Sequence, residues 1–550
     1  MSRTEEFVKN ALCLASVSFL IRAVSVSFNA YISSRIGAEG MGLFSLVMSV
    51  YGFAVCVACS GINLAATRLC AKAAVSADAE NIGAELKKTV KSCMLYSLFF
   101  GTAAGAAVFF GAELIGTHLL SDARTVPSLR ALGVCLPAVS LSSALSGYFT
   151  GVRRAKRNAA VMICGQMTLI FSVTAGLVFL LPRGMTWACF AVVLGSSLSE
   201  GISFLFSWIL YKLSLRRTVK ELQKSARDTP DGSDCAYAKT PAAVFGRMKP
   251  ERTAEKKKSK LGGRLNHLPG KFGEICSISV PVAIGSYLRQ GLVSLEHIAI
   301  MWGLRRFGSS SAQALSSYGT LHSMAMPVVM FPYAVISAFT SLLIPEMTSF
   351  AERGEYLRAR RVSRRVISTT VFCGIGACGV FMTFWYELGT AIYSSAEAGQ
   401  MIRLLAPVLP MMFLDTTVDA MLKGLGEHVY CMKVNTADAV TSLLLVLLLV
   451  PHIGIYGYVA VIYVSEAVNA SMSLSRLSCI TGTGMDFVRF VLLPVLSLAF
   501  AGICYPVLEY AALVLCGIEF GVGGIIVYAA IYCAPAALYY IVRKTCVKTA

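Results

Sequence analysis

The sequence is poor in charged residues. Only 14% of its 550 residues are Asp, Glu, Lys or Arg, whereas 56% are hydrophobic. Because a soluble domain carries about 25% charged residues, this composition excludes an ordinary soluble domain. Apolar windows of about 20 residues, long enough to cross a bilayer, recur along the chain, and the mean hydropathy is +0.67. The composition therefore predicts an integral membrane protein.

The sequence also lacks the motifs of an enzyme and the cysteine spacing of a secreted domain. It contains no Walker motif, no HExxH and no GxSxG with partners. Its 18 cysteines lie mostly inside apolar segments, so we expect free thiols packed as small hydrophobic groups. The first apolar run, residues 11–32, is too long for a signal peptide. We expect no catalytic activity, no metal and no cofactor.

Acidic residues are scarce relative to basic ones. There are 30 Asp and Glu against 49 Lys and Arg, which gives a net charge of +19. Such an excess could indicate nucleic-acid binding, but the basic residues alternate between the connections of the apolar segments. Forty lie in alternate connections that begin with the N-terminus, and only five lie in the others. The positive-inside rule predicts a multi-pass membrane protein with both termini in the cytoplasm, and no nucleic-acid partner.

The apolar segments predict an all-α fold of fourteen transmembrane helices. They fall at about residues 11–32, 43–66, 92–111, 129–150, 159–181, 186–211, 275–300, 317–343, 366–386, 401–422, 436–451, 455–475, 488–509 and 521–542. Between the sixth and the seventh lies a polar, basic connection that contains "EKKKSK". Its composition predicts a flexible cytoplasmic linker close to anionic lipid headgroups.

The helices on either side of the linker share a sequence pattern. "LRALGVCLP" (129–137) resembles "IRLLAPVLP" (402–410) at an offset of 273, which also relates Gly151 to Gly424. "SRIGA" after the first helix has a weaker echo in "RRFGS" after the seventh. We therefore expect two six-helix lobes in a parallel repeat, which is typical of alternating-access carriers, plus two extra C-terminal helices. The predicted parts are the N-lobe (1–211), the linker (212–272), the C-lobe (273–478), and helices 13 and 14 with the cytoplasmic tail (479–550).

Ionisable residues inside the predicted helices are candidate functional groups, because a charge near the bilayer centre costs roughly 2.5–3.5 kcal/mol on insertion scales. Arg22 and Asn29 share one face of the first helix, and Arg289 and Glu296 share a face of the seventh. Two guanidinium groups, one from each lobe, could grip a diphosphate in a shared cleft. We predict Arg22, Arg289 and Asn29 as substrate-binding residues in a cationic cavity.

Four acidic residues are candidates for coupling or counter-ion roles, namely Glu200, Glu296, Asp415 and Asp419. Asp415 and Asp419 lie one turn apart in the apolar run "LPMMFLDTTVDAMLKGLG" (409–426). They could be counter-ions to cavity arginines, carboxylates that couple transport to H⁺ or Na⁺, or caps on a broken helix. For Glu200, an ion pair that fixes helix packing is the alternative. The "GLGE" at 424–427 lacks the features of a phosphate loop and is expected to end its helix.

Three segments resemble one known family. "YISSRIGAEGMGLFSL" (31–46), "SYGTLHSMAMPVVMFPYAVISAFTSLLIPEM" (317–347) and "LAPVLPMMFLDTTVDAMLKGLGE" (405–427) are similar to the stage V sporulation protein B branch of the polysaccharide-transport family. This branch is part of the MOP exporter superfamily, together with MATE drug exporters and lipid II flippases. The resemblance covers almost the whole chain except the linker, and fourteen helices in two lobes plus two fit it.

The resemblance implies a flippase that moves an undecaprenyl-diphosphate-linked oligosaccharide or peptidoglycan precursor across the membrane by alternating access. Its partners would be the lipid-linked glycan, membrane lipids and a coupling ion (H⁺ or Na⁺), and a monomer is expected. In lipid II flippases the first helix carries an arginine followed by an Arg-Asp pair. Arg22 matches that arginine, but Phe28 and Asn29 stand in place of the pair, which leaves the substrate open.

Two other functions compete with the flippase. One is an H⁺- or Na⁺-coupled, MATE-like drug exporter that uses Glu200, Asp415 and Asp419. The other is a non-transport scaffold for envelope or spore assembly.

Overall fold

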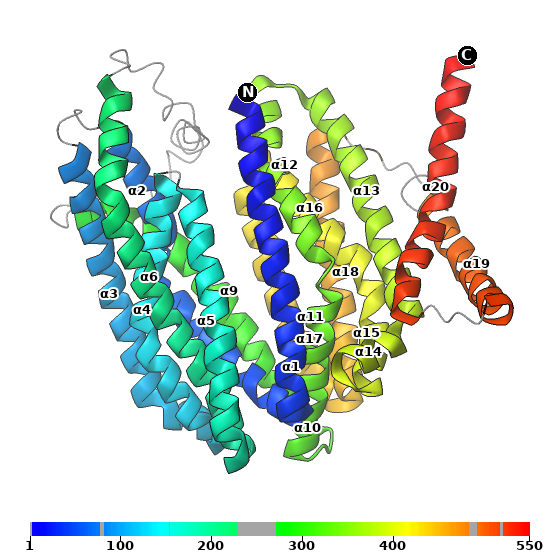
Figure 1. Cartoon of the computed structure of the whole chain (residues 1–550), viewed down its shortest axis with the longest axis horizontal. Coiled ribbons are helices and arrows are strands. Elements are labelled where there is room, and N and C mark those ends of the chain that lie inside the picture. The colour runs from blue at the N-terminus through cyan, green and yellow to red at the C-terminus, as the bar shows by residue number, and fades with distance from the viewer. Residues whose placement is uncertain are drawn as a thin grey trace. The chain divides into compact units, whose positions relative to one another are not determined.

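The computed structural model describes residues 3–76, 82–152, 154–227, 271–482, 484, 492–516 and 521–549. Within these residues the secondary structure is helical and no strand occurs. The chain divides into two compact units (Figure 1): unit 1 comprises Met1–Ser45 and Ala299–Ala550, and unit 2 comprises Leu46–Ile298. The boundaries of the units cut through two helices, α1 (Arg3–Cys59) and α9 (Lys271–Arg306). The predicted lobes, which divide the chain at the linker, stay a prediction.

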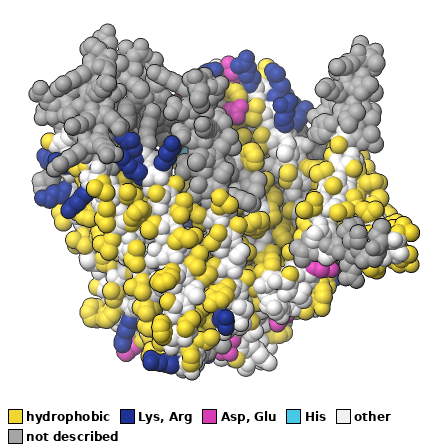
Figure 2. All heavy atoms as spheres, in the orientation of Figure 1, with side chains coloured by type: hydrophobic (Ala, Val, Ile, Leu, Met, Phe, Trp, Pro, Cys, Tyr) yellow, Lys and Arg dark blue, Asp and Glu magenta, His cyan; other side chains and the backbone are white. Residues whose placement is uncertain are grey.

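Nine described segments are long and apolar enough to cross a membrane. They are Leu20–Ala74, Ile82–Leu119, Ala123–Gly151, Lys156–Arg183, Thr186–Leu213, Tyr356–Thr383, Ala396–Gly424, His428–Ile453 and Leu493–Leu515. Large hydrophobic side chains are exposed on many of these helices, and Figure 2 shows them as a wide yellow surface. The protein is therefore an integral membrane protein, as the composition predicts, while the count of fourteen helices stays a prediction.

Unit 2 is a helical bundle in which α4 packs against α2, α3 and α6, and α5 packs against α6. Tyr148 and Phe149 of α4 lie in a buried core cluster with residues of α2, α3 and α6. A second cluster joins Ile275 of α9 to Ile62 and Tyr96. The elements that belong wholly to unit 2 are α2 (Ile62–Ser76), α3 (Ile82–Glu113), η1 (Leu114–Leu119), η2 (Ala123–Thr125), α4 (Val126–Gly151), α5 (Ala155–Leu180), η3 (Leu181–Arg183) and α6 (Met185–Arg227).

Unit 1 has the same pairing of helices around α16, which packs against α12, α13 and α18, while α17 packs against α18. The helices α19 and α20 pack against each other and against α13. The elements are α10 (Ser311–Tyr318), η5 (Gly319–Ala325), α11 (Met326–Val329), α12 (Tyr333–Arg353), α13 (Tyr356–Thr383), α14 (Trp385–Tyr393), α15 (Ala396–Leu405), η6 (Ala406–Val408), α16 (Leu409–Gly424), α17 (His428–Ile453), α18 (Ile455–Thr481), α19 (Leu493–Cys516), η8 (Gly521–Gly523) and α20 (Gly524–Thr549).

Close helix contacts recur in the two units at the offset found in the sequence. In unit 2, a Cβ on Gly101 would lie 2.9 Å from Cα of Pro137. In unit 1, a Cβ on Gly374 would lie 2.7 Å from Cα of Pro410, and both residues stand 273 positions after their counterparts. Because only glycine permits such an approach, these matched contacts support the duplication.

The turns after the two equivalent helices also match. The guanidinium carbon of Arg35 lies 5.5 Å from the ring centroid of Tyr31, and that of Arg306 lies 5.2 Å from the ring of Trp302. Each arginine is followed two residues later by a glycine with positive φ, Gly37 or Gly308. All three positions are related by an offset of 271, which is the offset of the "SRIGA" and "RRFGS" segments.

Several helices differ from the expected boundaries. The predicted helix at 43–66 is interrupted where Ser60 (φ 42°) and Gly61 (φ 71°) adopt left-handed conformations, which an α-helix cannot accommodate. The predicted helix at 317–343 contains the π-helix η5 and a break at 330–332, just before α12. That break lies at Pro332, one of two prolines (with Pro327) that lack the amide proton needed to continue a helix.

The helix before the predicted linker extends beyond its expected end. The helix α6 continues to Arg227, past the expected boundary at 212, because the polar sequence after the membrane segment still favours a helix. Residues 228–270 lie outside the described part of the chain. The "GLGE" segment ends α16, as predicted, since α16 stops at Gly424 and Gly426 has a φ of 93°.

Candidate functional site

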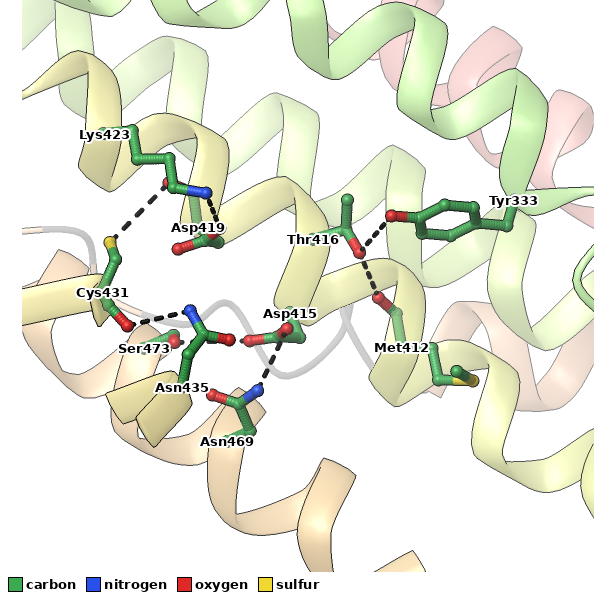
Figure 3. A network of polar contacts seen from close by, with 10 residues as sticks. All are labelled: Tyr333, Met412, Asp415, Thr416, Asp419, Lys423, Cys431, Asn435, Asn469 and Ser473. Carbon is green, nitrogen blue, oxygen red and sulfur yellow. Dashed lines mark hydrogen bonds and ion pairs between the residues drawn. The ribbon is translucent and has the colours of Figure 1, made fainter. Parts of the chain in front are cut away.

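An acidic cluster lies inside unit 1, where α16 meets α18 (Figure 3). Asp415 accepts hydrogen bonds from Nδ2 of Asn469 (3.3 Å) and Oγ of Ser473 (3.4 Å), both on α18. Asp419, one turn further along α16, forms an ion pair with Nζ of Lys423 at 2.5 Å. The two aspartates therefore have different environments: the charge of Asp419 is compensated by a lysine of its own helix, and Asp415 is held by neutral donors.

Two further acidic residues approach Asp415. Asp438 of α17 accepts a hydrogen bond from Oγ of Ser465 (2.5 Å), and both Asp438 and Glu466 of α18 lie within electrostatic range of Asp415. Asp438 and Glu466 were not predicted as site residues, although each is a carboxylate inside a predicted membrane helix, which is the signal that identified Asp415. Three helices thus bring carboxylates together around Asp415.

This arrangement can bind a proton or a small cation. Close carboxylates in a low-dielectric environment disfavour ionisation of all members at once, so uptake of positive charge stabilises the cluster. In the described part of the chain, no group of three or more His, Cys, Asp or Glu residues has the geometry of a metal site. In the described residues the cation that contacts Asp419 is Lys423, and a counter-ion role of this aspartate toward a cavity arginine stays a prediction.

Glu200 occupies a different environment in unit 2. It lies on α6 in a membrane-spanning segment and is partly buried. The groups within electrostatic range of its carboxylate include the hydroxyl of Tyr51 and the thiols of Cys59 and Cys135. The Tyr51 hydroxyl lies 3.8 Å from Sγ of Cys135. Among the described residues, none forms an ion pair with Glu200, so the ion-pair interpretation of this residue has no support.

Arg22 and Asn29 lie on α1 in unit 1. The side chain of Arg22 is exposed, and it has no ion-pair partner within the described ranges. Nδ2 of Asn29 donates to the carbonyl oxygen of Ser323 in η5 at 2.6 Å. The amide nitrogen of Asn29 thus has a partner within the protein, although the sequence predicted a contact with substrate.

Arg289 and Glu296 lie on α9 in unit 2. The side chain of Arg289 is exposed and that of Glu296 is partly buried. No ion pair of Arg289 occurs in the described residues. Because Arg22 belongs to unit 1 and Arg289 to unit 2, their meeting in one cationic cavity stays a prediction.

Two bundles of apolar helices with ionisable groups inside the membrane segments define a multi-pass membrane protein. Residues 7–229 match the family model described as "Polysaccharide biosynthesis protein". The chain is 22% identical to stage V sporulation protein B of Bacillus subtilis (strain 168) over 551 residues, which is 98% of this chain and 95% of the relative. It is 18% identical to sporulation protein YkvU of the same organism over 424 residues, covering 76% and 83% of the two chains.

Solved structures of transporters share the fold. The lipid II flippase MurJ, in an inward closed conformation, matches with a TM-score of 0.65 and 11% identity over 96% of this chain and 99% of that one. An inward-facing multidrug resistance MATE family transporter of the MOP superfamily matches with a TM-score of 0.59 and 16% identity, covering 86% and 100%. The resemblance found in the sequence is confirmed: the chain is similar to stage V sporulation protein B along almost its whole length and shares the fold of MurJ and of a MATE transporter of the MOP superfamily.

Proposed function

We propose that the protein is a flippase that moves an undecaprenyl-diphosphate-linked oligosaccharide or peptidoglycan precursor across the bacterial cytoplasmic membrane. The observation that carries the proposal is the pair Arg22 and Arg289, two exposed arginines without ion-pair partners among the described residues. Arg22 lies in the membrane-spanning candidate Leu20–Ala74, and Arg289 lies on α9 within the helix that the sequence predicts at 275–300. An arginine inside a membrane segment needs an anionic partner or a wet cavity. A diphosphate meets this need, because its oxygens accept paired hydrogen bonds from guanidinium groups. The similarity to stage V sporulation protein B and the MurJ fold supports this assignment.

A complementation experiment tests the narrower proposal that the transported lipid is lipid II. Cells depleted of their own lipid II flippase should survive when this protein is expressed, and expression of Arg22→Gln or Arg289→Gln should fail to rescue them. The matched control is Arg35→Gln, which removes an arginine from the same helix as Arg22. Lysis despite correct insertion of the wild-type protein would exclude lipid II and leave other lipid-linked glycans.

A second candidate is an H⁺- or Na⁺-coupled exporter related to the MATE neighbour. It is favoured by the acidic cluster, in which Asp415, Asp438 and Glu466 lie within electrostatic range of one another. The same carboxylates could instead couple flipping to an ion gradient. Glu200, which has no ion-pair partner in the described residues, is the alternative coupling group.

Transport in proteoliposomes under an imposed Na⁺ or H⁺ gradient separates these roles. If the acidic cluster couples transport, Asp415→Asn and Glu466→Gln should abolish the dependence on the gradient, while Glu200→Gln should keep it. The control is Glu397→Gln, which neutralises an exposed carboxylate in the first turn of α15. Loss of the gradient dependence in Glu200→Gln alone would assign coupling to unit 2. Export of cationic drugs by the Arg22→Gln, Arg289→Gln double variant would favour the exporter over the flippase.

A further inference from the structure

A dense group of arginines lies at one end of unit 1. The helix α12 ends at Arg353, and five more arginines occupy the first ten residues of α13: Arg358, Arg360, Arg361, Arg364 and Arg365. We call these six residues the α13 arginine cluster. Figure 2 shows dark-blue side chains gathered at this end of α12 and α13, beyond the yellow hydrophobic surface.

Little negative charge compensates this cluster. Nη1 of Arg358 forms an ion pair with Oε2 of Glu355 at 2.8 Å. Among the described residues, no other ion pair involves the six arginines. Glu352 is exposed nearby. The cluster therefore keeps a net positive charge, and at least four guanidinium groups have donors available for an external anion.

The position of the cluster on α13 places it at the level of lipid headgroups. The helix is a membrane-spanning candidate over Tyr356–Thr383, and its arginines precede the apolar part. Tyr356 and Leu357 are 49% and 73% exposed, so an aromatic and an aliphatic side chain lie beside the charges. This combination is typical of the boundary between headgroups and acyl chains, where tyrosine is enriched. By the predicted orientation, this end faces the cytoplasmic leaflet.

Arg364 is the most enclosed of the group. Its Nε is buried and has no hydrogen-bond partner in the described residues, and its Nη2 lies 3.7 Å from the position that a Cβ on Gly484 would occupy. Because this Nε is buried, an anionic oxygen that approaches from outside the protein would meet the terminal Nη groups of the half-buried Arg364 side chain. A phosphate oxygen supplies such an acceptor.

We propose that the α13 arginine cluster binds the phosphate groups of anionic glycerophospholipids in the cytoplasmic leaflet. The arrangement favours several headgroups rather than one diphosphate. At 100° and 1.5 Å per residue, Arg358 to Arg365 spread over an arc of roughly 160° and a rise of about 10 Å, so the guanidinium groups diverge. Divergent charges suit a ring of annular lipids, each contributing one phosphate. The proposal is independent of the transported substrate.

The test compares lipid retention by the purified full-length protein in native mass spectrometry, with phosphatidylglycerol, phosphatidylcholine and undecaprenyl diphosphate as probes. The wild type should retain phosphatidylglycerol preferentially, and the triple variant Arg361→Gln, Arg364→Gln, Arg365→Gln should lose at least about fivefold in that preference, since each basic residue near an anionic surface contributes about 1 kcal/mol. The matched control removes the same charge elsewhere, as Arg35→Gln, Arg183→Gln, Arg306→Gln, and should stay within about twofold of the wild type. Replacement of the three cluster residues by lysine should retain part of the preference.

Three outcomes would overturn the proposal. Equal retention of the two lipids by the wild type would show no anionic preference, and equal losses in both triple variants would show a general charge effect. Loss of undecaprenyl diphosphate with retention of phosphatidylglycerol would assign the cluster to the substrate. If the glutamine variant does not fold, the lysine variant and single substitutions at Arg361 or Arg365, both exposed, carry the comparison.

Discussion

At the scale of single residues, the two aspartates of α16 differ in how their charge is compensated. Both were identified from the sequence as carboxylates in an apolar run, but their partners could not be predicted, because Asn469 and Ser473 belong to α18, more than fifty positions away. Lys423, four residues after Asp419, was visible in the sequence. Local spacing could therefore have predicted the ion pair, whereas the setting of Asp415 depends on packing between distant helices.

The ion pair of Asp419 leads to a prediction about stability. Lys423→Gln should lower the free energy of unfolding by about 0.5–1.5 kcal/mol, because it leaves the aspartate, whose side chain is 19% exposed, without its cation. The double variant Asp419→Asn, Lys423→Gln should recover most of this loss. Thermal unfolding in detergent measures both, and additive losses in the double variant would contradict the pairing.

At the scale of elements, matched glycine–proline contacts hold helices together in each unit. The equivalence of Pro137 and Pro410 was found in the sequence, but their partners Gly101 and Gly374 were not, because nothing in a single sequence marks which glycine a distant helix approaches. The π-helix η5 was also not predicted from the sequence. Its carbonyl oxygen at Ser323 accepts a hydrogen bond from Asn29 of α1, and the spacing of apolar residues cannot reveal a contact between positions so far apart in the chain.

These contacts predict the effect of adding a side chain. Gly101→Val and Gly374→Val should each destabilise the protein by about 1–3 kcal/mol, because a Cβ would meet the proline backbone of the neighbouring helix. Gly201→Ala is the control, since nothing lies within 4 Å of a Cβ at that helical position, and it should be neutral or stabilise by up to about 1 kcal/mol. Thermal unfolding is again the measurement. Similar effects at all three positions would show that helix propensity, and not the close approach, determines the cost.

At the scale of the whole molecule, composition and charge distribution sufficed to predict a membrane-embedded, all-helical protein, whereas the similarity to MOP superfamily transporters was predicted from the resemblance of three sequence segments. The compact units could not be predicted, since the first part of α1 packs in unit 1 and most of α9 packs in unit 2, whereas the linker suggested a division between residues 211 and 273. Most of α9 belongs to unit 2, where it packs against α2 through residues such as Ile275 and Ile62, although in the sequence it follows the predicted linker.

In the proposed transport reaction, Arg22 and Arg289 bind the diphosphate of a lipid-linked glycan during its transfer. The most direct test reconstitutes the purified protein in vesicles with a fluorescent undecaprenyl-diphosphate-linked glycan and follows its exposure to a quencher added outside. Arg22→Gln and Arg289→Gln should each slow transfer by at least about tenfold, which corresponds to the loss of about 1.4 kcal/mol. The lysine variants should be less impaired, and Arg35→Gln should match the wild type. Unchanged transfer in a folded double glutamine variant would contradict the account.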